Sequence, residues 1–586
     1  MARIAIVDKK KCSPENCGHF LCIRVCPVNR RGDECIVEWE DHKPSIDEKI
    51  CIGCGICVKK CPFGAISIIN LPEQLDKPPI HCYGKNGFHL FNLPMPIFGK
   101  VVGIIGRNGI GKTTAINILS GLLKPNLGKP RHKAKLSELV EYFKGTELHN
   151  YFEKLEAGEI RVAVKPQQVS LIPKHFSGTV RELLKKMDEK HQIEGIVKQL
   201  NLIEVLDRHL NQISGGELQK VAIAACALKK AQVYFFDEPT SYLDVKQRIL
   251  VSKFIRGLAD ENTAVVVIEH DLILLDYMTD LVHITFGEPS AYGIVSGLKS
   301  TREGVNEYLS GMLRKENIRF RANPITFDDK PPAKSFKHEG LVEWEHIEKQ
   351  LGGFKLEVEP GAVSKKTTVG ILGENGIGKT TFVRIVAGEL EPDKGKISKK
   401  VSVSYKPQYI DTDSKEKVKD FLKDAITKSR NEIVLPLELD KVLNEKLCEL
   451  SGGELQKVMI AKCLADEEAE LYLMDEPSAY LDVEQRLTVS KLIRRFTQTH
   501  GKTALIVDHD MLFVDYLSDE LIVFEGKPAV EGLLKGPYPM EQGMNLFLSS
   551  LEISMRRDPD TKRPKINKQD SRLDREQKKL GRLYYA

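Results

Sequence analysis

Short runs of apolar residues recur along the chain between glycine-rich and charged segments. The runs KVVGII (100–105) and TTVGIL (367–372) each precede a glycine-rich loop, and VYFFD (233–237) and LYLMD (471–475) each end in an aspartate. Continuous apolar runs of this length, bounded by turn residues, are typical of buried strands. We therefore predict two such strands in each half of the chain, each leading into a polar or glycine-rich segment.

One segment repeats its apolar residues at helical spacing instead. Two apolar stripes flank Gly145, and they consist of Leu136, Val140 and Phe143 and of Leu148, Phe152 and Leu155. This spacing predicts a helix–loop–helix near residues 131–160. Such stripes pack into a core or dock a partner, and both readings stay open here.

Length and composition limit the number of domains and the class of protein that the chain can form. At 586 residues the chain is too long for one hydrophobic core, so we expect two or three domains. The longest apolar run (221–228) has eight residues, whereas a membrane-spanning helix needs about twenty. The N-terminus has no apolar stretch followed by a cleavage site, as a secretory signal would. We expect a cytoplasmic protein without a membrane segment.

The positive charge is concentrated near the C-terminus. The net charge is only +5, yet residues 551–586 carry eleven Lys or Arg and six Asp or Glu. A second basic segment, GMLRKENIRFRANPITF (311–327), contains Asn-Pro near its end, which is a loop signal. Charged runs are usually solvated surface, but these two segments are candidates for contact with a phosphate backbone.

Nine of the thirteen cysteines lie within the first 61 residues. They form the patterns C-x4-C-x4-C-x3-C-P (12–27) and C-x2-C-x2-C-x3-C-P (51–62), which are typical of a two-cluster ferredoxin. In that arrangement the fourth cysteine of each group ligates the other group's cluster. The predicted ligands are Cys12, Cys17, Cys22 and Cys61 for one [4Fe–4S] cluster, and Cys26, Cys51, Cys54 and Cys57 for the other.

Cys35 is left over by this assignment, and we do not expect it to be a ligand. The other four cysteines (82, 226, 448 and 463) are scattered, which favours buried apolar side chains. Paired cysteines also bind zinc, but the dense second group favours a cluster. No flavin or other redox site is recognisable downstream, which weakens an electron-transfer function.

The rest of the chain is an internal repeat. GIIGRNGIGKTT (103–114) matches GILGENGIGKTT (370–381), SGGELQKV occurs at 214–221 and 451–458, and YFFDEPTSYLD (234–244) matches YLMDEPSAYLD (472–482). The first pair contains the P-loop pattern GxxxxGK[ST], in which backbone amides cradle phosphate and the lysine reaches the β- and γ-phosphates. The predicted phosphate-binding residues are Gly106, Asn108, Gly109, Gly111, Lys112, Thr113 and Thr114, then Gly373, Asn375, Gly376, Gly378, Lys379, Thr380 and Thr381.

Acidic residues follow the second apolar strand of each half. Asp237 and Asp475 are placed to help hold Mg²⁺. Glu238 and Glu476, the next residues, are placed to orient or deprotonate an attacking water. Two P-loops and two acidic strands in register indicate ATP hydrolysis, because chance does not produce such a repeated set.

At this point the two halves resemble ATP-binding cassette (ABC) nucleotide-binding domains. The resemblance implies a phosphate-sensing, magnesium-contacting glutamine at Gln167 and Gln408, and switch histidines at His270 and His509. Its signature segments match Ser214 with Gly216 and Ser451 with Gly453, and its D-loops match residues 241–244 and 479–482. It further implies that Thr113 and Thr380 contact Mg²⁺, and that Tyr83, Phe88 and Phe354 are candidates for stacking on adenine.

The family's cassettes pack head to tail, which implies one ATP between Lys112 and Ser451 and another between Lys379 and Ser214. One departure is visible, because Glu217 and Glu454 replace the usual signature glutamine. From P-loop lysine to glutamine there are 55 residues in the first half and 29 in the second, so only the first carries the helix–loop–helix.

Over its whole length the chain resembles the RNase L inhibitor family, ABC subfamily E, which comprises the ribosome recycling factors of archaea and eukaryotes. Neither a detached transporter subunit nor a DNA-repair ATPase fits as well, since the first needs no iron–sulfur domain and the second carries long coiled-coil insertions. The implied fold is an α/β protein, with a ferredoxin-like domain (1–75) followed by two head-to-tail ABC domains (76–304 and 331–545) and two basic hinges (305–330 and 546–586).

The resemblance implies splitting of ribosomes into subunits after termination or stalling. It implies binding to the small ribosomal subunit beside a release factor or Pelota-like partner, contacts with initiation factors, and a monomer whose cassettes form an intramolecular dimer. The implied cofactors are two [4Fe–4S] clusters, ATP or ADP, and Mg²⁺. Two alternatives stay open: a redox-coupled soluble ABC ATPase, and an ATP-gated anti-association or inhibitor protein.

Overall fold

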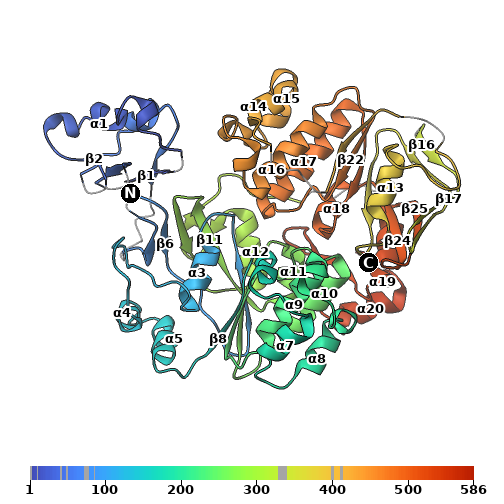
Figure 1. Ribbon diagram of the computed structural model, residues 1–586, viewed down its shortest axis with the longest axis horizontal. Coiled ribbons are helices and arrows are strands. Elements are labelled where there is room, and N and C mark those ends of the chain that lie inside the picture. The colour runs from blue at the N-terminus through green and yellow to red at the C-terminus, as the bar shows by residue number, and fades with distance from the viewer. Residues whose placement is uncertain are drawn as a thin grey trace.

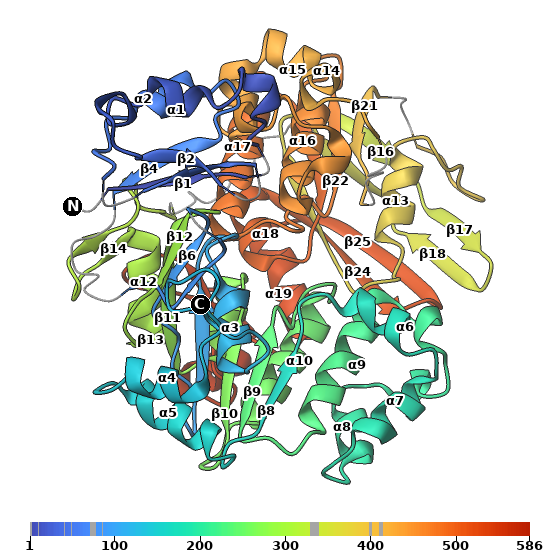
Figure 2. The ribbon, with the colours of Figure 1, turned by 60° about the vertical axis from the view of Figure 1, so that its left-hand side comes forward.

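The computed structural model describes residues 3–9, 11–39, 42–47, 50–70, 78–84, 86–327, 339–397, 401–408 and 414–585. Figure 1 shows a small N-terminal domain (blue) and two larger α/β domains, which we call cassette one (cyan to green) and cassette two (yellow to red). Turning the view brings the N-terminal domain forward, where it lies above the strands of cassette one (Figure 2).

The N-terminal domain is built from short elements around a small core. Strand β1 (Arg3–Val7) pairs antiparallel with β4 (Ile66–Asn70), and β2 (Ile36–Glu38) pairs with β3 (Pro44–Ile46). The helices α1 (Leu21–Val25) and α2 (Ile56–Lys60) are each followed directly by a cysteine of the predicted clusters. Several of its buried side chains are cysteines, so apolar packing alone contributes little to its stability.

Each cassette contains the predicted buried strands at the centre of a mainly parallel sheet. In cassette one the order of the parallel strands is β11, β7, β10, β9 and β8, and in cassette two it is β24, β20, β23, β22 and β21. Their bounds are β7 Val101–Ile105, β8 Val162–Lys165, β9 Val233–Asp237, β10 Ala264–Ile268, β11 Leu281–Glu288, β20 Thr368–Leu372, β21 Val403–Lys406, β22 Leu471–Asp475, β23 Thr503–Val507 and β24 Glu520–Lys527. Helices cover both faces, which is why these strands are apolar throughout.

A smaller region with both parallel and antiparallel strand pairs extends each sheet. In cassette one it comprises β5 (His81–Cys82), β6 (His89–Phe91) and β12 (Tyr292–Val295), and in cassette two β17 (Ile347–Leu351), β18 (Phe354–Val358) and β25 (Glu531–Pro539). The same strand order in both halves confirms the internal repeat at the level of structure.

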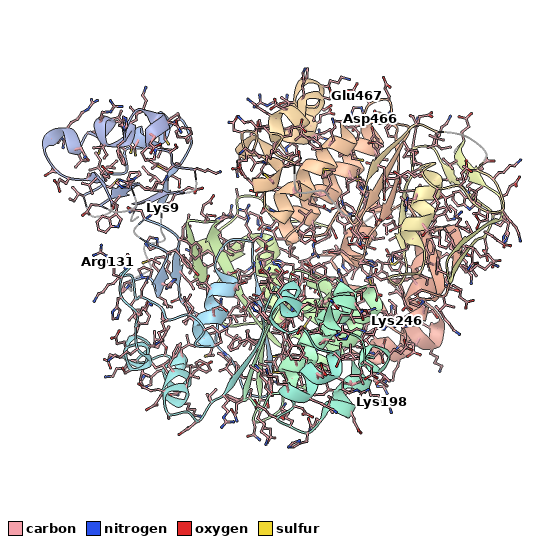
Figure 3. All side chains as sticks on the ribbon, viewed as in Figure 1. Lys9, Arg131, Lys198, Lys246, Asp466 and Glu467 are labelled. Carbon is pink, nitrogen blue, oxygen red and sulfur yellow. The ribbon has the colours of Figure 1, made fainter. Side chains whose placement is uncertain are left out.

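The segment with helical spacing contains α4 (Leu136–Tyr142) and α5 (Glu147–Glu156). The rings of Phe143 and Phe152 stack at 5.3 Å, and both side chains are buried in the core of cassette one. Just before α4, the guanidinium of Arg131, labelled in Figure 3, lies 5.9 Å from the ring of Trp39 in the N-terminal domain. The apolar stripes therefore serve internal packing, and the adjoining loop contacts the N-terminal domain.

Two of the expected domain boundaries fall inside helices. The boundary at 304 lies within α12 (Thr301–Ser310), and that at 545 lies within α19 (Met540–Ser550). A helix is one hydrogen-bonded unit, so each linker begins after its helix ends. The expected boundaries after 75 and 330 lie outside the described residues.

The C-terminal segment bridges the cassettes and buries part of its positive charge. Its strand β27 (Pro564–Ile566) packs on α11 (Leu272–Met278) of cassette one, where Lys565 lies 2.8 Å and the fully buried Arg563 3.4 Å from the carboxylate of Asp276. At the other end, the Tyr585 hydroxyl donates to Asp515 of cassette two at 3.1 Å. The segment stays a candidate for contact with a phosphate backbone, but Arg563 and Lys565 are excluded from that contact, because they are buried against the carboxylate of Asp276.

Among the described helices, none combines the length and the apolar character needed to cross a lipid bilayer.

Candidate nucleotide-binding sites

The P-loop of cassette one joins β7 to α3 (Lys112–Leu119). Gly111, immediately before this helix, has a φ of +86°, and a methyl group there would lie 2.7 Å from the ring of Phe88. Only glycine fits this position, because both its backbone conformation and the neighbouring ring exclude a side chain. The Lys112 ammonium donates to the carbonyls of Gly106 at 2.9 Å and Arg107 at 2.6 Å. The loop thus presents its amides at a helix N-terminus, as an anion site requires.

Asp237 lies at the end of β9, directly beside the P-loop helix. The Thr113 hydroxyl donates to its Oδ2 at 2.7 Å, while its Oδ1 is buried without a hydrogen-bond partner. Burial raises the pKa of Asp237, although the bond from Thr113 opposes this shift. A buried carboxylate oxygen left without a donor, next to a hydroxyl, fits a Mg²⁺ site of the P-loop type.

Glu238 follows Asp237 and faces two of the predicted partners. The Gln167 side-chain amide donates to Glu238 Oε1 at 2.7 Å, and Nε2 of His270 lies 3.5 Å from the same oxygen. Burial alone would raise the pKa of Glu238, but His270, Lys112 and a bond from Ser241 outweigh it and lower the pKa to about 2. The carboxylate is therefore ionised at neutral pH and able to accept a hydrogen bond from a water molecule.

Cassette two repeats this arrangement almost atom for atom. Thr380 donates to Asp475 at 2.7 Å, Gln408 donates to Glu476 at 2.7 Å, and His509 lies 3.5 Å from Glu476. The Lys379 ammonium donates to two carbonyls of its own loop. The helix that follows the loop, α13 (Lys379–Val386), matches α3. The two halves therefore hold the same predicted groups in the same relations.

The signature segments begin long buried helices. Ser214 is the N-cap of α9 (Gly215–Ala227), and Ser451 is the N-cap of α16 (Gly452–Leu464). Each forms a capping box with the glutamate three residues on, and the Ser214 hydroxyl also donates to Glu217 at 2.8 Å. The glutamate that replaces the usual glutamine therefore keeps the helix cap, which either residue type can form, and its carboxylate orients the serine.

The two cassettes contact each other through reciprocal hydrogen bonds at the sites. The backbone N–H of Asn108 in the first P-loop donates to Asp482 at 3.1 Å, and that of Asn375 in the second donates to Asp244 at 3.0 Å. Each aspartate ends the D-loop of the opposite cassette. This reciprocity is a head-to-tail arrangement, while the pairing of Lys112 with Ser451 and of Lys379 with Ser214 stays a prediction.

Ion pairs of opposite polarity flank these contacts. At the first site Arg107 lies 3.5 Å from Glu484, and at the second Glu374 lies 2.8 Å from Lys246, which Figure 3 labels on α10 (Val245–Gly257). Arg107 in the first P-loop corresponds to Glu374 in the second. Their partners, Glu484 and Lys246, carry the opposite charges. The charges therefore attract only when unlike cassettes face each other.

Reversing one of these charges is expected to weaken closure of the cassettes. Lys246→Glu places two carboxylates opposite each other at a partly exposed position, so we expect the lifetime of the closed, ATP-bound state to fall about two- to five-fold. Adding Glu374→Lys should restore it. Fluorescence energy transfer between labels on the two cassettes measures that lifetime, and a double variant no better than the single one would contradict the interpretation.

The three aromatic candidates occupy two kinds of position. Phe88 and Phe354 are equivalent, because each ring packs against the P-loop glycine that precedes the lysine. Tyr83 is half exposed, and its hydroxyl lies 3.2 Å from that of Thr114. These placements are compatible with contact to a nucleotide base, and a role in stacking stays a prediction.

Four predicted cluster ligands line one pocket in the N-terminal domain. Cys26, Cys51, Cys54 and Cys57 surround it together with the apolar residues Val28, Ile36 and Ile68. Cys22 lies near Cys12 and Cys17, and burial, together with these neighbouring thiols, raises its pKa to about 12. In the described part of the chain no His, Cys, Asp or Glu group is spaced to hold a single metal ion. Thiols arranged around a pocket of this kind fit an iron–sulfur cluster.

Cys35 is set aside by the motif, yet it lines the same pocket. It is 1% exposed and lies beside the thiols of Cys26 and Cys51, and burial with these neighbours raises its pKa. Spacing gives no signal for this placement, because Cys35 comes from the loop before β2. The motif assignment, in which Cys35 is not a ligand, stays the prediction.

Several groups at the sites are missed by the motifs. The buried Lys165 and Lys406 contact the catalytic segments of their own cassettes. The D-loop match gave no role to Asp244 and Asp482, whose side chains accept hydrogen bonds from the opposite P-loop. Burial lowers the pKa of Lys165 to about 8, although the nearby acidic groups oppose this shift. One sequence signal could have pointed to these groups: the segments KPQ and SGGELQ are identical in both halves.

Three family models match the chain. One described as "ABC transporter" matches residues 97–241 and 359–479. One described as "Possible Fer4-like domain in RNase L inhibitor, RLI" matches residues 2–34, and one described as "4Fe-4S binding domain" matches residues 44–67. The matches fall within the two cassettes and the cysteine-rich domain.

Relatives with established names align over nearly their whole length. The translation initiation factor RLI1 of Saccharomyces cerevisiae is 43% identical and covers 100% of this chain and 98% of its own. A ribosome-bound archaeal ABCE1, in a model with Pelota, has a TM-score of 0.93 and 52% identity over 100% of this chain and 99% of its own. An archaeal ribosome recycling factor aABCE1, in complex with the ribosomal stalk protein aP1, has a TM-score of 0.84 and 49% identity over 88% and 100%. The protein therefore belongs to the RNase L inhibitor family, the iron–sulfur, twin-cassette ABC ATPases of subfamily E.

Proposed function

We propose that this protein is an ATP-driven ribosome recycling factor, which binds the small ribosomal subunit and splits ribosomes after termination or stalling. The observation that carries the proposal is the likeness over the entire chain to a ribosome-bound relative, with the N-terminal domain included. That relative is bound to the ribosome together with Pelota, which supports a Pelota-like factor or a release factor as partner. Such a role places the protein in the cytoplasm, and contacts with initiation factors belong to the same proposal.

The site geometry supports ATP hydrolysis at both composite sites. Lys112 and Lys379 would bind the β- and γ-phosphates, and Glu238 and Glu476 would orient the attacking water beside His270 and His509. Thr113 with Asp237, and Thr380 with Asp475, would hold Mg²⁺, with Gln167 and Gln408 contacting it. The bound ion would neutralise charge that develops on the phosphates.

The N-terminal domain would hold two [4Fe–4S] clusters on the eight cysteines of the two motifs. We assign them a structural role, since the domain's core is small and iron–sulfur bonds would make it rigid. The domain touches both cassettes: Lys11 lies 3.5 Å from Glu445 of cassette two, and Asn86, next to cassette one, donates to the carbonyl of Ile46 at 2.8 Å. Motion of one cassette against the other would therefore displace it.

Closure follows from the reciprocal contacts. When ATP fills a P-loop, its γ-phosphate can also meet the signature serine of the opposite cassette, so the nucleotide stabilises only the closed state. Hydrolysis removes that shared phosphate and allows the cassettes to separate. Each cycle would thus convert chemical energy into movement of the rigid N-terminal domain against a bound partner.

Sedimentation in a sucrose gradient tests the proposal. Anaerobically purified protein, ribosomes and a release-factor partner are mixed with no nucleotide, with ATP or with a non-hydrolysable analogue. We expect ATP to deplete the intact ribosome peak, and the analogue to leave the protein on small subunits.

Other results of the gradient would favour one of the two alternative functions. Protein on small subunits with no loss of intact ribosomes would favour the anti-association protein. Intact ribosomes and unbound protein in every lane would contradict a ribosomal function. If oxidising or reducing the clusters then changed the ATPase rate, a redox-coupled ATPase would take its place.

A further inference from the structure

The two glutamates assigned to hydrolysis have an unusual backbone. Glu238 has a φ of 46° and Glu476 a φ of 48°. This left-handed region is unfavourable for residues with a side chain, and it persists at functional sites only where surrounding contacts hold it. The question is therefore which groups fix these two residues.

In cassette one, two buried side chains hold the carbonyl of Glu238. The Lys165 ammonium donates to the carbonyls of Asp237 at 2.8 Å and Glu238 at 3.2 Å, and the Gln219 amide donates to that of Glu238 at 2.7 Å. Both side chains are 0% exposed. A cation and an amide thus converge on one carbonyl at the point of strain.

Cassette two has the same arrangement. Lys406 donates to the carbonyls of Asp475 at 2.7 Å and Glu476 at 3.3 Å, and Gln456 donates to that of Glu476 at 2.5 Å. The two halves of the chain hold the same pair of donors on the same strained residue. Coincidence of packing does not account for that repetition.

A buried lysine is a costly way to provide hydrogen bonds. Among the described residues, no carboxylate lies within ion-pair distance of the Lys165 or Lys406 ammonium, and both side chains are at most 1% exposed. A neutral donor would satisfy a carbonyl with less loss of hydration. The positive charge is therefore better explained by its position, directly behind the acidic pair of each site.

The glutamine adds a connection to the other site. Gln219 lies in α9, whose N-cap is the signature serine Ser214, expected to face the nucleotide bound by Lys379. One helix therefore reaches the second site with its N-terminus and holds the first site's Glu238 five residues later. Helix α16 makes the reverse connection through Ser451 and Gln456.

We propose that Lys165 with Gln219, and Lys406 with Gln456, are positioning residues that hold the catalytic glutamate and couple it to nucleotide at the opposite site. The proposal rests on the proposed function, because it presupposes that Glu238 and Glu476 act in hydrolysis. Nucleotide bound against the signature serine would fix the helix, and the helix would fix the glutamate through its glutamine.

Single-turnover hydrolysis at the first site tests the lysine. In full-length protein carrying Glu476→Gln, which blocks turnover at the second site, we expect Lys165→Met to slow hydrolysis about ten- to hundred-fold with ATP affinity nearly unchanged. Lys220→Met is the matched control, since Lys220 is buried in α9 but points to the carbonyl of Asn201. We expect that control to hydrolyse at the parent rate.

Gln219→Met tests the coupling and covers the case in which Lys165→Met fails to fold. First-site hydrolysis is compared when the second site is filled, in Glu476→Gln, and when it cannot bind, in Lys379→Ala. We expect the ratio of these two rates to approach one in Gln219→Met, whereas Lys220→Met keeps the parent ratio. A merely structural role of Gln219 would lower both rates and leave their ratio unchanged.

Glu238→Gln in the same assay separates a failure of the catalytic assignment from a failure of the positioning proposal. If it hydrolyses ATP normally, the catalytic assignment itself fails. If it is inactive while folded Lys165→Met and Gln219→Met keep the parent rates and the parent ratio, the positioning proposal is overturned and the proposed function stands.

Discussion

Replacing Glu238 or Glu476 by Gln should slow ATP hydrolysis at its own site about a hundred- to ten-thousand-fold and trap the closed, ATP-bound protein. Glutamine keeps the size of the side chain but loses the ionised carboxylate, which His270 or His509 and the neighbouring lysine hold at a low pKa. ATP should still bind, because neither glutamate belongs to a P-loop. Rapid-quench hydrolysis and retention of labelled nucleotide during gel filtration measure the two effects.

The matched control is a carboxylate elsewhere on the interface. Glu374→Gln removes the ion pair with Lys246 but leaves the carboxylates beside the phosphates intact, so we expect hydrolysis within about five-fold of the parent. Normal turnover together with normal release from the small subunit in both Glu238→Gln and Glu476→Gln would overturn the catalytic assignment.

Replacing Cys57 by Ser should remove about half of the iron and destabilise the N-terminal domain. Cys57 is buried in the pocket shared by Cys26, Cys51 and Cys54, and a serine hydroxyl is a poor ligand for a cluster. Since the domain's core is small, metal binding and folding should be coupled. Iron analysis should give about four atoms per chain in place of about eight, and limited proteolysis should cut before residue 75.

The cassettes should survive this substitution, because their cores are separate from that of the N-terminal domain. We therefore expect ATP binding to persist while ribosome splitting is lost. Cys448→Ser is the control and should keep all the iron. Cys448 lies in cassette two and is exposed, so the expectation that it is buried was wrong, whereas Cys82, Cys226 and Cys463 are buried as expected. Full iron content in Cys57→Ser would contradict the ligand assignment, and Cys35, beside Cys26 and Cys51, would then be the first alternative to test.

Features that lie within short contiguous segments could be predicted from the amino-acid sequence. Strands such as β7 and β9 are buried on both faces, so they appear as unbroken apolar runs. A P-loop is one strand, one turn and one helix, so its glycines and Lys112 keep fixed spacing. Cluster ligands likewise follow a local pattern, and the repetition of every motif indicates two cassettes in one chain.

Contacts between residues far apart in the chain became visible only in the folded molecule. Asp482 meets the N–H of Asn108 across 374 positions, and no spacing rule encodes such a contact. Charge counts placed Arg563 among possible phosphate contacts, whereas packing buries it against Asp276. Lys165 would be taken for a surface lysine from its type alone, yet it lies behind the strained Glu238. In each case the reason is the same: burial and partners are set by the packing of whole elements, which local sequence does not specify.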